Sequence, residues 1–381
     1  MSNTIRLFFA GDFCSKPSTS LISVSDELKA LISGCDLKVV NFEVPLKPDV
    51  KLPHVEYERF FQNDDAPAFL KNLGFNLFPI ANNHVFDWGD EGFLKVKHAF
   101  GDEAFGAGSY EEAYRVKCVE IKGKKIGFLA LTFATKSGVF YDVMNHDGLG
   151  CAYIHDLKVN HVIMEAKKEV DYLMVLPHDG IEFIDAPLPE VMAKYRDFVE
   201  YGADAVIGTH PHCPQGWEEY QGKPIFYSLG NFFFNSKNAL SYRVLNRPHW
   251  YEGLCVVMEI NEDGMKYTIH NTFNKDNVEL LLDHTPLRVE NNRKICSYLI
   301  DKKRYQTYLR CALKQSSLKD LGLLDSSILK GNIKIRIKIM AKRWMNCLKG
   351  IGKQNDPQII EYMKNDSRQN ALLRFINSKL S

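Results

Sequence analysis

Short apolar segments alternate with amphipathic segments over residues 1–284, and this alternation restricts the fold more than any other feature of the chain. Strand-like apolar segments lie at 5–10, 38–42, 75–80, 125–132, 172–176, 205–207 and 224–229. Helical spacing of apolar residues occurs at 66–73, 91–100, 157–169 and 189–201. Two hairpins are expected around turns at 122–124 and 261–264. Strands that alternate with helices predict an α/β fold, in which loops at the carboxyl ends of strands line the ligand crevice.

The distribution of charge divides the chain into two parts. The whole chain has 48 Lys and Arg residues against 47 Asp and Glu residues. Residues 285–381 hold 21 of the cations and 7 of the acids, so their net charge is +14, and residues 1–284 carry −13. Opposed blocks of charge predict two functional parts. We therefore expect one α/β domain over residues 1–284 and a basic, mainly helical region over residues 285–381.

The basic region allows two interpretations. It could bind a polyanion, such as an acidic polymer, an anionic lipid surface or nucleic acid. Alternatively, it is a solvated helical face that packs on the acidic front domain. Within it, residues 332–351 fit either a strand or a helix, and their continuation into 341–344 favours a helix. No zinc-finger, RRM or helix-turn-helix signature is present, which argues against nucleic acid.

The ends and the cysteines indicate a compartment. The N-terminal segment has no cationic stretch followed by a long apolar run, which argues against a signal peptide. No segment approaches the roughly 20 apolar residues of a transmembrane helix. The nine cysteines are scattered and form no Cys-x-x-Cys pair, which argues against a disulfide framework and a structural zinc site. We expect a cytoplasmic protein, with membrane association through the basic region left open.

Side chains that can bind metal recur where the predicted strands end. They are Asp12, Glu43, Asn83, His178, His210 and His212. Each alone could belong to a turn, a helix cap or a buried structural histidine. Together they form a mixed set, since imidazole suits Zn, Mn, Fe or Ni and carboxylate or amide oxygen suits harder divalent ions. Such a set with one bridging carboxylate is what a two-metal hydrolytic site needs.

The pair His210 and His212 is the strongest local feature. In an extended backbone the side chains at positions i and i+2 point the same way. We therefore expect both imidazoles to reach one point, although a structural histidine pair would give the same spacing.

Six motifs occur in a fixed order: GD, NxE, ANNHxxDxG, HxGxE, GADAVIGTHPH and YSLGNFFF. In this chain they lie at 11–12, 41–43, 81–89, 178–182, 202–212 and 227–234. In this order they resemble the CapA family of poly-γ-glutamate capsule synthesis, within the calcineurin-like metallophosphoesterase superfamily. The resemblance covers about residues 5–234, and the hairpin to about residue 272 would complete the domain. It implies a four-layer αββα sandwich, with the basic helical region as an extension.

The resemblance also implies the ligands of one or two divalent ions, which we expect to be Mn, Fe or Zn. Glu43 would bridge the two metal positions. Asp12 and His212 would bind the first ion. The second ion would be bound by Asn83, His178 and His210.

Two further residues would act as the catalytic pair of this family. His84 would protonate the leaving oxygen or stabilise charge on the transferred group. Asp87 would orient His84, although a carboxylate at a helix N-terminus is an alternative reading. Asn231 and Glu182 are candidates for supporting the ligands.

The chain departs from the family pattern near the first metal position. Cys14 stands where the wider superfamily has a histidine, so the first position is poor in ligands and a single-metal site is an alternative. An inert buried cysteine is favoured over a thiolate ligand. Lys16 stands where the family has an arginine, and Asp179 and Phe183 replace its Trp and Tyr.

Three functions follow from these features. The first is a metal-dependent hydrolase of phosphoester-type bonds in capsule, poly-γ-glutamate or exopolysaccharide synthesis, acting on an acidic polymer or a phosphoester. The second is a non-catalytic component that holds metal or a polyanion and contacts the membrane or a capsule synthase through the basic region. The third, a nucleic-acid phosphodiesterase, is disfavoured by the acidic front domain.

Overall fold

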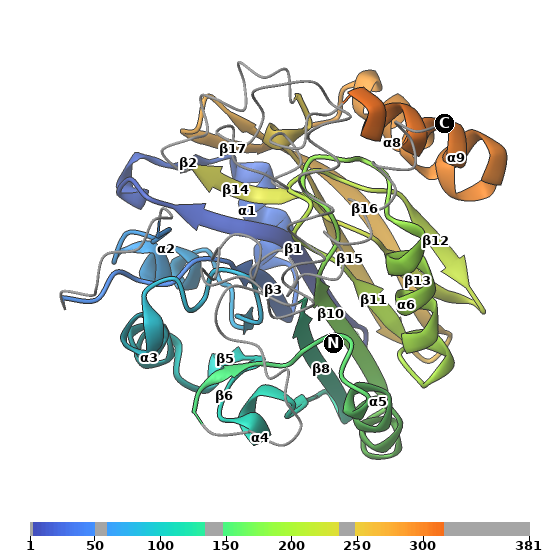
Figure 1. Ribbon diagram of the computed structural model, residues 1–381. Helices are drawn as coiled ribbons and strands as arrows, with labels where there is room; N and C mark the ends of the chain where they lie inside the picture. The colour runs from blue at the N-terminus through green and yellow to red at the C-terminus, as the bar shows by residue number, and fades with distance from the viewer. Residues whose placement is uncertain (1–2, 50–58, 134–147, 236–247, 316–381) are drawn as a thin grey trace, which may run out of the picture.

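The computed structural model describes residues 3–49, 59–133, 148–235 and 248–315. Its α/β architecture is built on two large β-sheets that pack face to face, with helices on their outer sides (Figure 1). The predicted α/β class is thereby confirmed. The helix expected at 332–351 lies outside the described residues.

The first sheet has the strand order β14-β1-β15-β16-β17-β2, and β3 also pairs with β1. Strand β1 pairs with three strands: it is parallel to β14 and β3 and antiparallel to β15. The strands are β1 Ile5–Ser15, β2 Ser23–Val24, β3 Leu37–Phe42, β14 Asn231–Asn235, β15 Glu252–Asn261, β16 Gly264–Lys275 and β17 Glu279–Leu282.

The second sheet has the order β12-β13-β11-β10-β8-β7, in which the four inner strands are parallel and each edge is a hairpin partner. Its strands are β7 Lys117–Ile121, β8 Lys124–Thr132, β10 Tyr172–His178, β11 Ala205–Ile207, β12 Trp217–Tyr220 and β13 Lys223–Phe226. Two small sheets pair β4 Phe78–Pro79 with β5 Ala104–Phe105, and β6 Ala107–Gly108 with β9 Gly150–Cys151.

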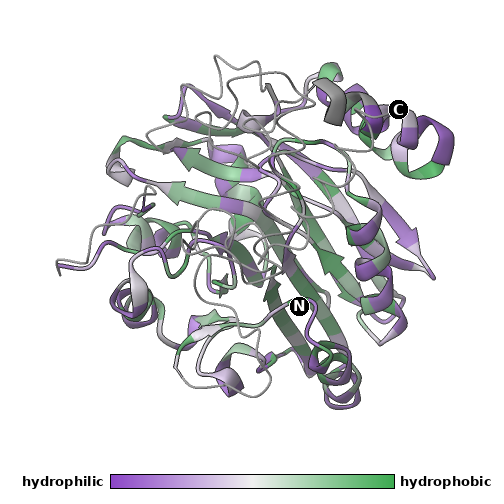
Figure 2. Ribbon diagram, viewed as in Figure 1, coloured by the Kyte–Doolittle hydropathy of each residue, from purple (hydrophilic) through white to green (hydrophobic). Residues whose placement is uncertain are grey.

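Hydrophilic residues are frequent in the helices, whereas the inner strands are mainly hydrophobic (Figure 2). The α-helices are α1 Asp26–Ser33, α2 Ala66–Asn72, α3 Gly89–Phe100, α4 Tyr110–Ala113, α5 Lys158–Glu169, α6 Pro189–Glu200, α8 Pro286–Ile300 and α9 Lys302–Gln315. Helix α1 lies against the first sheet, and α5 and α6 lie against the second. Short 3-10 helices span η1 Thr19–Leu21, η2 Gly101–Glu103 and η3 Pro248–Tyr251. Among the described helices, none combines the length and the apolar character that crossing a membrane requires.

The main core lies between the two sheets. Phe9 of β1 and Phe128 of β8 meet there, with ring centroids 6.4 Å apart. A second core lies on the outer face of the second sheet, where α5 contributes Ile163 and α6 contributes Tyr195 and Phe198. Because both faces of the parallel strands are covered, their segments are apolar without interruption, as the sequence pattern indicated.

The observed strands differ from the predicted ones where polar residues are buried. β1 continues to Ser15 instead of ending at residue 10, so Asp12 lies within the strand, beside a bulge between Asp12 and Phe13. The segment 75–80 forms only the two-residue strand β4, and β14 was not predicted. Asp12 in β1 and Asn231 in β14 are polar residues within buried strands, and in the sequence such residues look like strand ends.

Helices α8 and α9 pack against the second core through Tyr298, Tyr305 and Leu309. The Tyr305 hydroxyl donates to the carbonyl of Pro187 at 2.6 Å. Helix α8 also lies very close to the backbone at Gly216. A Cβ atom at this position would be 2.8 Å from the carbonyl oxygen of Ile295 in α8. Residues 286–315 therefore contribute to the core of the α/β domain, and the boundary between residues 284 and 285 stays a prediction from charge.

A partly buried ion network connects α8 to η3, which contains Trp250. Arg288 of α8 donates to Asp283 at 2.7 Å and also to Glu252 of β15. The other oxygen of Glu252 lies 2.9 Å from Nδ1 of His249, and this hydrogen bond raises the pKa of His249. Helix α8 thus supports η3, which precedes β15.

The packing of α9 predicts a matched pair of stability effects. Leu309→Ala removes a side chain that is only 5% exposed, whereas Ile300→Ala removes one that is 86% exposed. We expect Leu309→Ala to lower the free energy of unfolding by about 2–3 kcal/mol and Ile300→Ala to change it by less than about 0.5 kcal/mol. Denaturant unfolding of the full chain measures both values, and equal effects would contradict the packing of α9.

Candidate metal centre

Asp12 is placed by the close contact of β1 with Gly230, the residue before β14. Only glycine fits at position 11, because a Cβ atom there would lie 1.9 Å from the carbonyl oxygen of Gly230. Asp12 is fully buried and accepts hydrogen bonds from Asn41 Nδ2 at 2.7 Å and from the backbone N–H of His210 at 3.1 Å. Burial raises the pKa of Asp12, and neighbouring His212 opposes this shift.

Glu43 follows β3 directly and is also fully buried. Within the described ranges, neither of its carboxylate oxygens has a hydrogen-bond partner. Its carboxylate lies 3.4 Å from Nε2 of His212 and 3.9 Å from Nε2 of His178. Burial, followed by repulsion from Asp12, raises the pKa of Glu43 well above its usual value. A buried carboxylate without a donor is costly, and a cation beside it would remove that cost.

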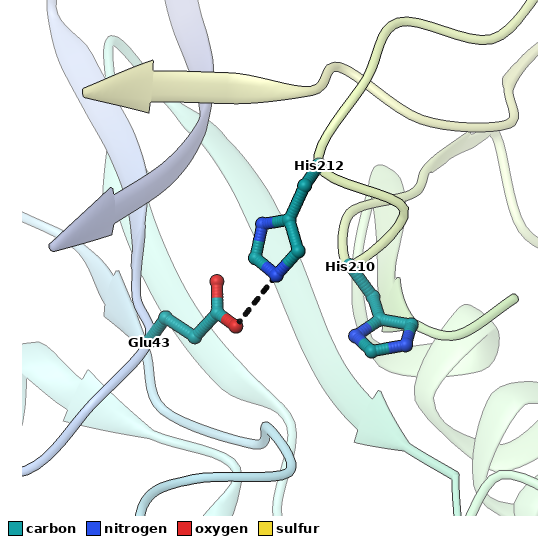
Figure 3. Close-up of side chains that lie close together, drawn as sticks. All are labelled: Glu43, His210 and His212. Carbon is teal, nitrogen blue, oxygen red and sulfur yellow. Dashed lines mark ion pairs between the residues drawn. The ribbon is translucent and has the colours of Figure 1, made fainter. Parts of the chain in front are cut away.

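The histidines come from the second sheet, opposite the two carboxylates. His178 ends β10, and His210 and His212 lie in the loop that follows β11. Figure 3 shows Glu43 facing this loop, with the dashed line to His212. The site therefore lies between the two sheets, at the carboxyl ends of β3, β10 and β11.

The expectation of an extended His-Pro-His segment is wrong. His210 has φ 100° and His212 has φ 55°, so both backbones are in the left-handed region that non-glycine residues rarely adopt. The imidazoles still converge, but a twisted loop brings them together instead of a strand. Such backbone strain is typical of functional sites, where the surrounding contacts maintain it.

Two overlapping groups of side chains have potential ligand atoms within 4.8 Å of one another. One contains Asp12, Glu43 and His178, and the other contains Glu43, His210 and His212. Ligand atoms at about 2.1 Å from one ion are about 3.0–3.4 Å apart in octahedral or tetrahedral geometry. The 3.4 Å between Glu43 and His212 fits this spacing. The donor set therefore fits divalent metal, with Glu43 common to both groups.

Asn83 reaches the same centre. Its Oδ1 lies 2.9 Å from Nε2 of His178. Nδ1 of His178 lies 3.0 Å from Thr209 Oγ1 and 3.2 Å from Asn41 Nδ2. Burial, followed by the charges of His212 and His84, lowers the pKa of His178 well below its usual value. His178 is therefore neutral, the form in which imidazole binds metal.

Asn231 fixes the orientation of His212. Its Nδ2 donates to the carbonyl of Trp250 at 2.9 Å, so its Oδ1 is left to accept from Nδ1 of His212, also at 2.9 Å. The proton on Nδ1 leaves the lone pair on Nε2, the nitrogen that faces Glu43. Asn231 thus orients His212, which is one of the expected metal ligands.

His84 and Asp87 form a pair on the more open side of the site. Nδ1 of His84 lies 2.9 Å from Oδ2 of Asp87, which also accepts from the backbone N–H of Phe60 at 2.9 Å. The His84 side chain is 19% exposed, whereas those of His178 and His212 are 1% and 6% exposed. A reactant would therefore meet His84 before the buried residues.

Cys14 does not replace the histidine of the wider superfamily. It is buried beside Val44, Phe234 and Trp250, outside both metal-compatible groups found in the described residues. Burial, followed by the negative charge of Glu43, raises the pKa of its thiol well above the usual value. Cys14 is therefore a protonated core residue, as the sequence favoured.

Sequence reasoning missed the aromatic side chains around the histidines. Phe133 lies 4.5 Å from His210, Trp250 lies 5.1 Å from His212, and Phe183 stacks on His212 at 6.0 Å, all between ring centroids. No local pattern marks these residues, because they are distant from one another in the chain. The hydrogen bonds of Asn41, by contrast, could have been sought in the NxE motif.

Buried carboxylates and imidazoles between two mixed sheets define a candidate metal-binding α/β protein. Residues 7–236 match the family described as "Bacterial capsule synthesis protein PGA_cap". The chain therefore belongs to that family, and the predicted resemblance to CapA proteins is confirmed.

Two relatives illustrate the similarity. The PGA biosynthesis protein CapA of Bacillus subtilis is 30% identical over 220 residues, which are 56% of this chain and 57% of that protein. The capsule biosynthesis protein CapA of Bacillus anthracis is 28% identical over 203 residues, 51% of this chain and 49% of that protein. The alignments therefore cover only about half the length of these relatives.

Solved structures that partly resemble this chain include the following two. A phosphatase from Mycoplasma pneumoniae has 16% identity and a TM-score of 0.43, over 76% of this chain and 98% of that one. A 5'-nucleotidase from Candida albicans has 12% identity and a TM-score of 0.39, over 69% of this chain and 50% of that one.

Glu43 predicts opposite effects with and without metal. Because its folded-state pKa is raised, the buried carboxylate lowers stability above its unfolded pKa, and Glu43→Gln removes this penalty. We expect metal-stripped Glu43→Gln protein to be at least as stable as the stripped natural chain. We also expect it to lose most of the rise in Tm that Mn²⁺ or Zn²⁺ gives the natural chain. Thermal unfolding with and without each ion measures this; an undiminished rise in Tm would exclude Glu43 as a ligand.

Asn231 predicts an effect on affinity through His212. Asn231→Leu leaves Nδ1 of His212 without its acceptor, so we expect metal affinity to fall by about 10–100-fold. Asn235→Leu on the same strand is the matched control, because Asn235 donates to the carbonyl of Asn277 instead. Metal titration of both variants, by calorimetry, tests this; equal affinities would contradict the role of Asn231.

Proposed function

We propose that this capsule synthesis protein is a metal-dependent hydrolase of phosphoester-type bonds. The observation that supports it best is Glu43, a buried carboxylate shared by two ligand groups and without a hydrogen-bond donor in the described part of the chain. We propose Asp12, Glu43, Asn83, His178, His210 and His212 as the residues that hold one or two divalent ions. When bound, such ions act as Lewis acids and lower the pKa of water.

His84 would donate a proton to the leaving group. A carboxylate accepts hydrogen bonds, so Asp87 holds the proton of His84 on Nδ1. The opposite nitrogen, Nε2, is then the one that exchanges a proton with a reactant. The backbone N–H of Phe60 holds the same oxygen of Asp87, which keeps the pair in place before a reactant arrives.

The substrate would belong to capsule assembly. The relatives are named for the biosynthesis of PGA and of capsule, and a further relative in Mycobacterium tuberculosis is called a probable polyglutamine synthesis accessory protein. We propose that the substrate is an acidic polymer or a phosphoester precursor, and that the protein works beside a synthase. A membrane or synthase contact through the basic region, and a cytoplasmic location, stay part of this proposal.

Two substitutions distinguish the loss of catalysis from the loss of metal binding. We expect His84→Asn to retain the metal content of the natural chain while lowering the hydrolysis of a nitrophenyl phosphodiester by about 10²–10⁴-fold. His210→Ala should lose both metal and activity, because His210 belongs to a ligand group. Elemental analysis and steady-state kinetics provide the two readouts.

Two other results would refute the hydrolase or the metal centre. Natural protein that contains metal but hydrolyses none of a broad panel of esters, yet is retained on immobilised poly-γ-glutamate, would refute the enzyme. It would support a non-catalytic assembly component instead. A metal content near zero in protein purified without added metal would refute the centre itself.

A further inference from the structure

Three cations gather on a pair of aromatic rings next to the candidate catalytic pair. Lys16 lies 4.7 Å from the centroid of Phe61, and Lys47 lies 5.5 Å from Phe61 and 5.4 Å from Trp88. Arg59 lies 5.6 Å from Trp88. The two rings meet edge to face at 5.9 Å. We call these five residues the cation–aromatic patch.

Two hydrogen bonds to the backbone of Phe60 connect the patch with the candidate catalytic pair. Trp88 Nε1 donates to the carbonyl of Phe60 at 2.9 Å, and the N–H of Phe60 donates to Asp87 at 2.9 Å. The Phe60 ring meets the His84 ring at 4.9 Å. Phe60 therefore faces the site, while its neighbour Phe61 belongs to the patch. A chain lying across the patch would continue towards His84.

The charges of Lys47 and Arg59 are not neutralised within the described ranges, where neither forms an ion pair. Lys47 is exposed, and Arg59 Nε is buried with no hydrogen-bond partner among the described residues. Neighbouring Lys95 shows the contrast, because it is paired with Asp64 at 2.8 Å. Since residues 1–284 carry a net charge of −13, these cations mark a place where an acidic ligand would escape repulsion.

We propose that the cation–aromatic patch binds an acidic polymer with regularly repeated carboxylates, of the poly-γ-glutamate kind, and leads it to the metal centre. Among the described contacts, Lys16 lies over Phe61, Lys47 over both rings and Arg59 over Trp88, so the three cations follow one another across the pair of rings. This distribution suits a row of charges along a chain better than a single phosphate group. The inference rests on the proposed function in one respect, because it takes the metal centre to be where the polymer would react.

The test removes two charges from the patch and two from elsewhere. The patch variant is Lys47→Gln with Arg59→Gln, and the control variant is Lys29→Gln with Lys124→Gln, whose lysines are about half exposed on other parts of the fold. Binding of poly-γ-glutamate of defined length is measured by titration at low salt. We expect the patch variant to bind about tenfold more weakly than the control variant. Both variants should retain the metal content of the natural chain.

Each outcome decides one proposal. Equal affinities of the patch and control variants would overturn the patch, whatever the result with esters. Tenfold weaker binding by the patch variant, together with a natural chain inert towards esters, would support the patch and refute the hydrolase. Linear polyphosphate serves as competitor, and tight binding of it without binding of poly-γ-glutamate would overturn the proposed ligand. If the double variant unfolds, Lys47→Gln alone applies the same test, since Lys47 is exposed.

Discussion

The enclosure of Glu43 between two sheets is the constraint on which the rest of the site depends. A carboxylate without hydrogen-bond donors is unfavourable in a protein interior, and it persists only where the surrounding fold is stable enough to hold it. Here that stability comes from apolar strands on both sides and from aromatic rings around the histidines. The same enclosure lowers the pKa of His178, so the conditions that disfavour a charged acid favour a neutral ligand.

The sequence indicated several residues that lie together in the candidate site, but it did not predict how they meet. Polar residues that interrupt apolar segments indicated Asp12 and Glu43, because an α/β sheet collects such positions at one edge. The sequence placed Asp12 after a strand, whereas it lies inside β1, because a bulge beside it is invisible in an apolar–polar pattern. His210 and His212 converge through left-handed backbones, which no spacing rule anticipates.

The aromatic surroundings were beyond prediction for a different reason. Phe133, Phe183 and Trp250 reach the histidines from three separate segments, and only the completed fold brings those segments together. The family motifs, by contrast, indicated Asn231, which begins β14 and forms a hydrogen bond with His212. The charge pattern separated residues 285–381 from the rest, yet it could not show that Tyr305 and Leu309 pack into the second core. Burial of apolar side chains decides such packing, and net charge does not report it.

The two carboxylates belong to one sheet and the three histidines to the other. An ion bound by the carboxylates and the histidines at the same time would therefore link the two sheets. The free energy of metal binding would add to the free energy that holds the two sheets together. Loss of the ion would first weaken the contact between the sheets at the end where the ligands lie. Release of metal and separation of the layers would then be one coupled event, so the lifetime of the bound ion would report how firmly the two halves of the molecule are held together.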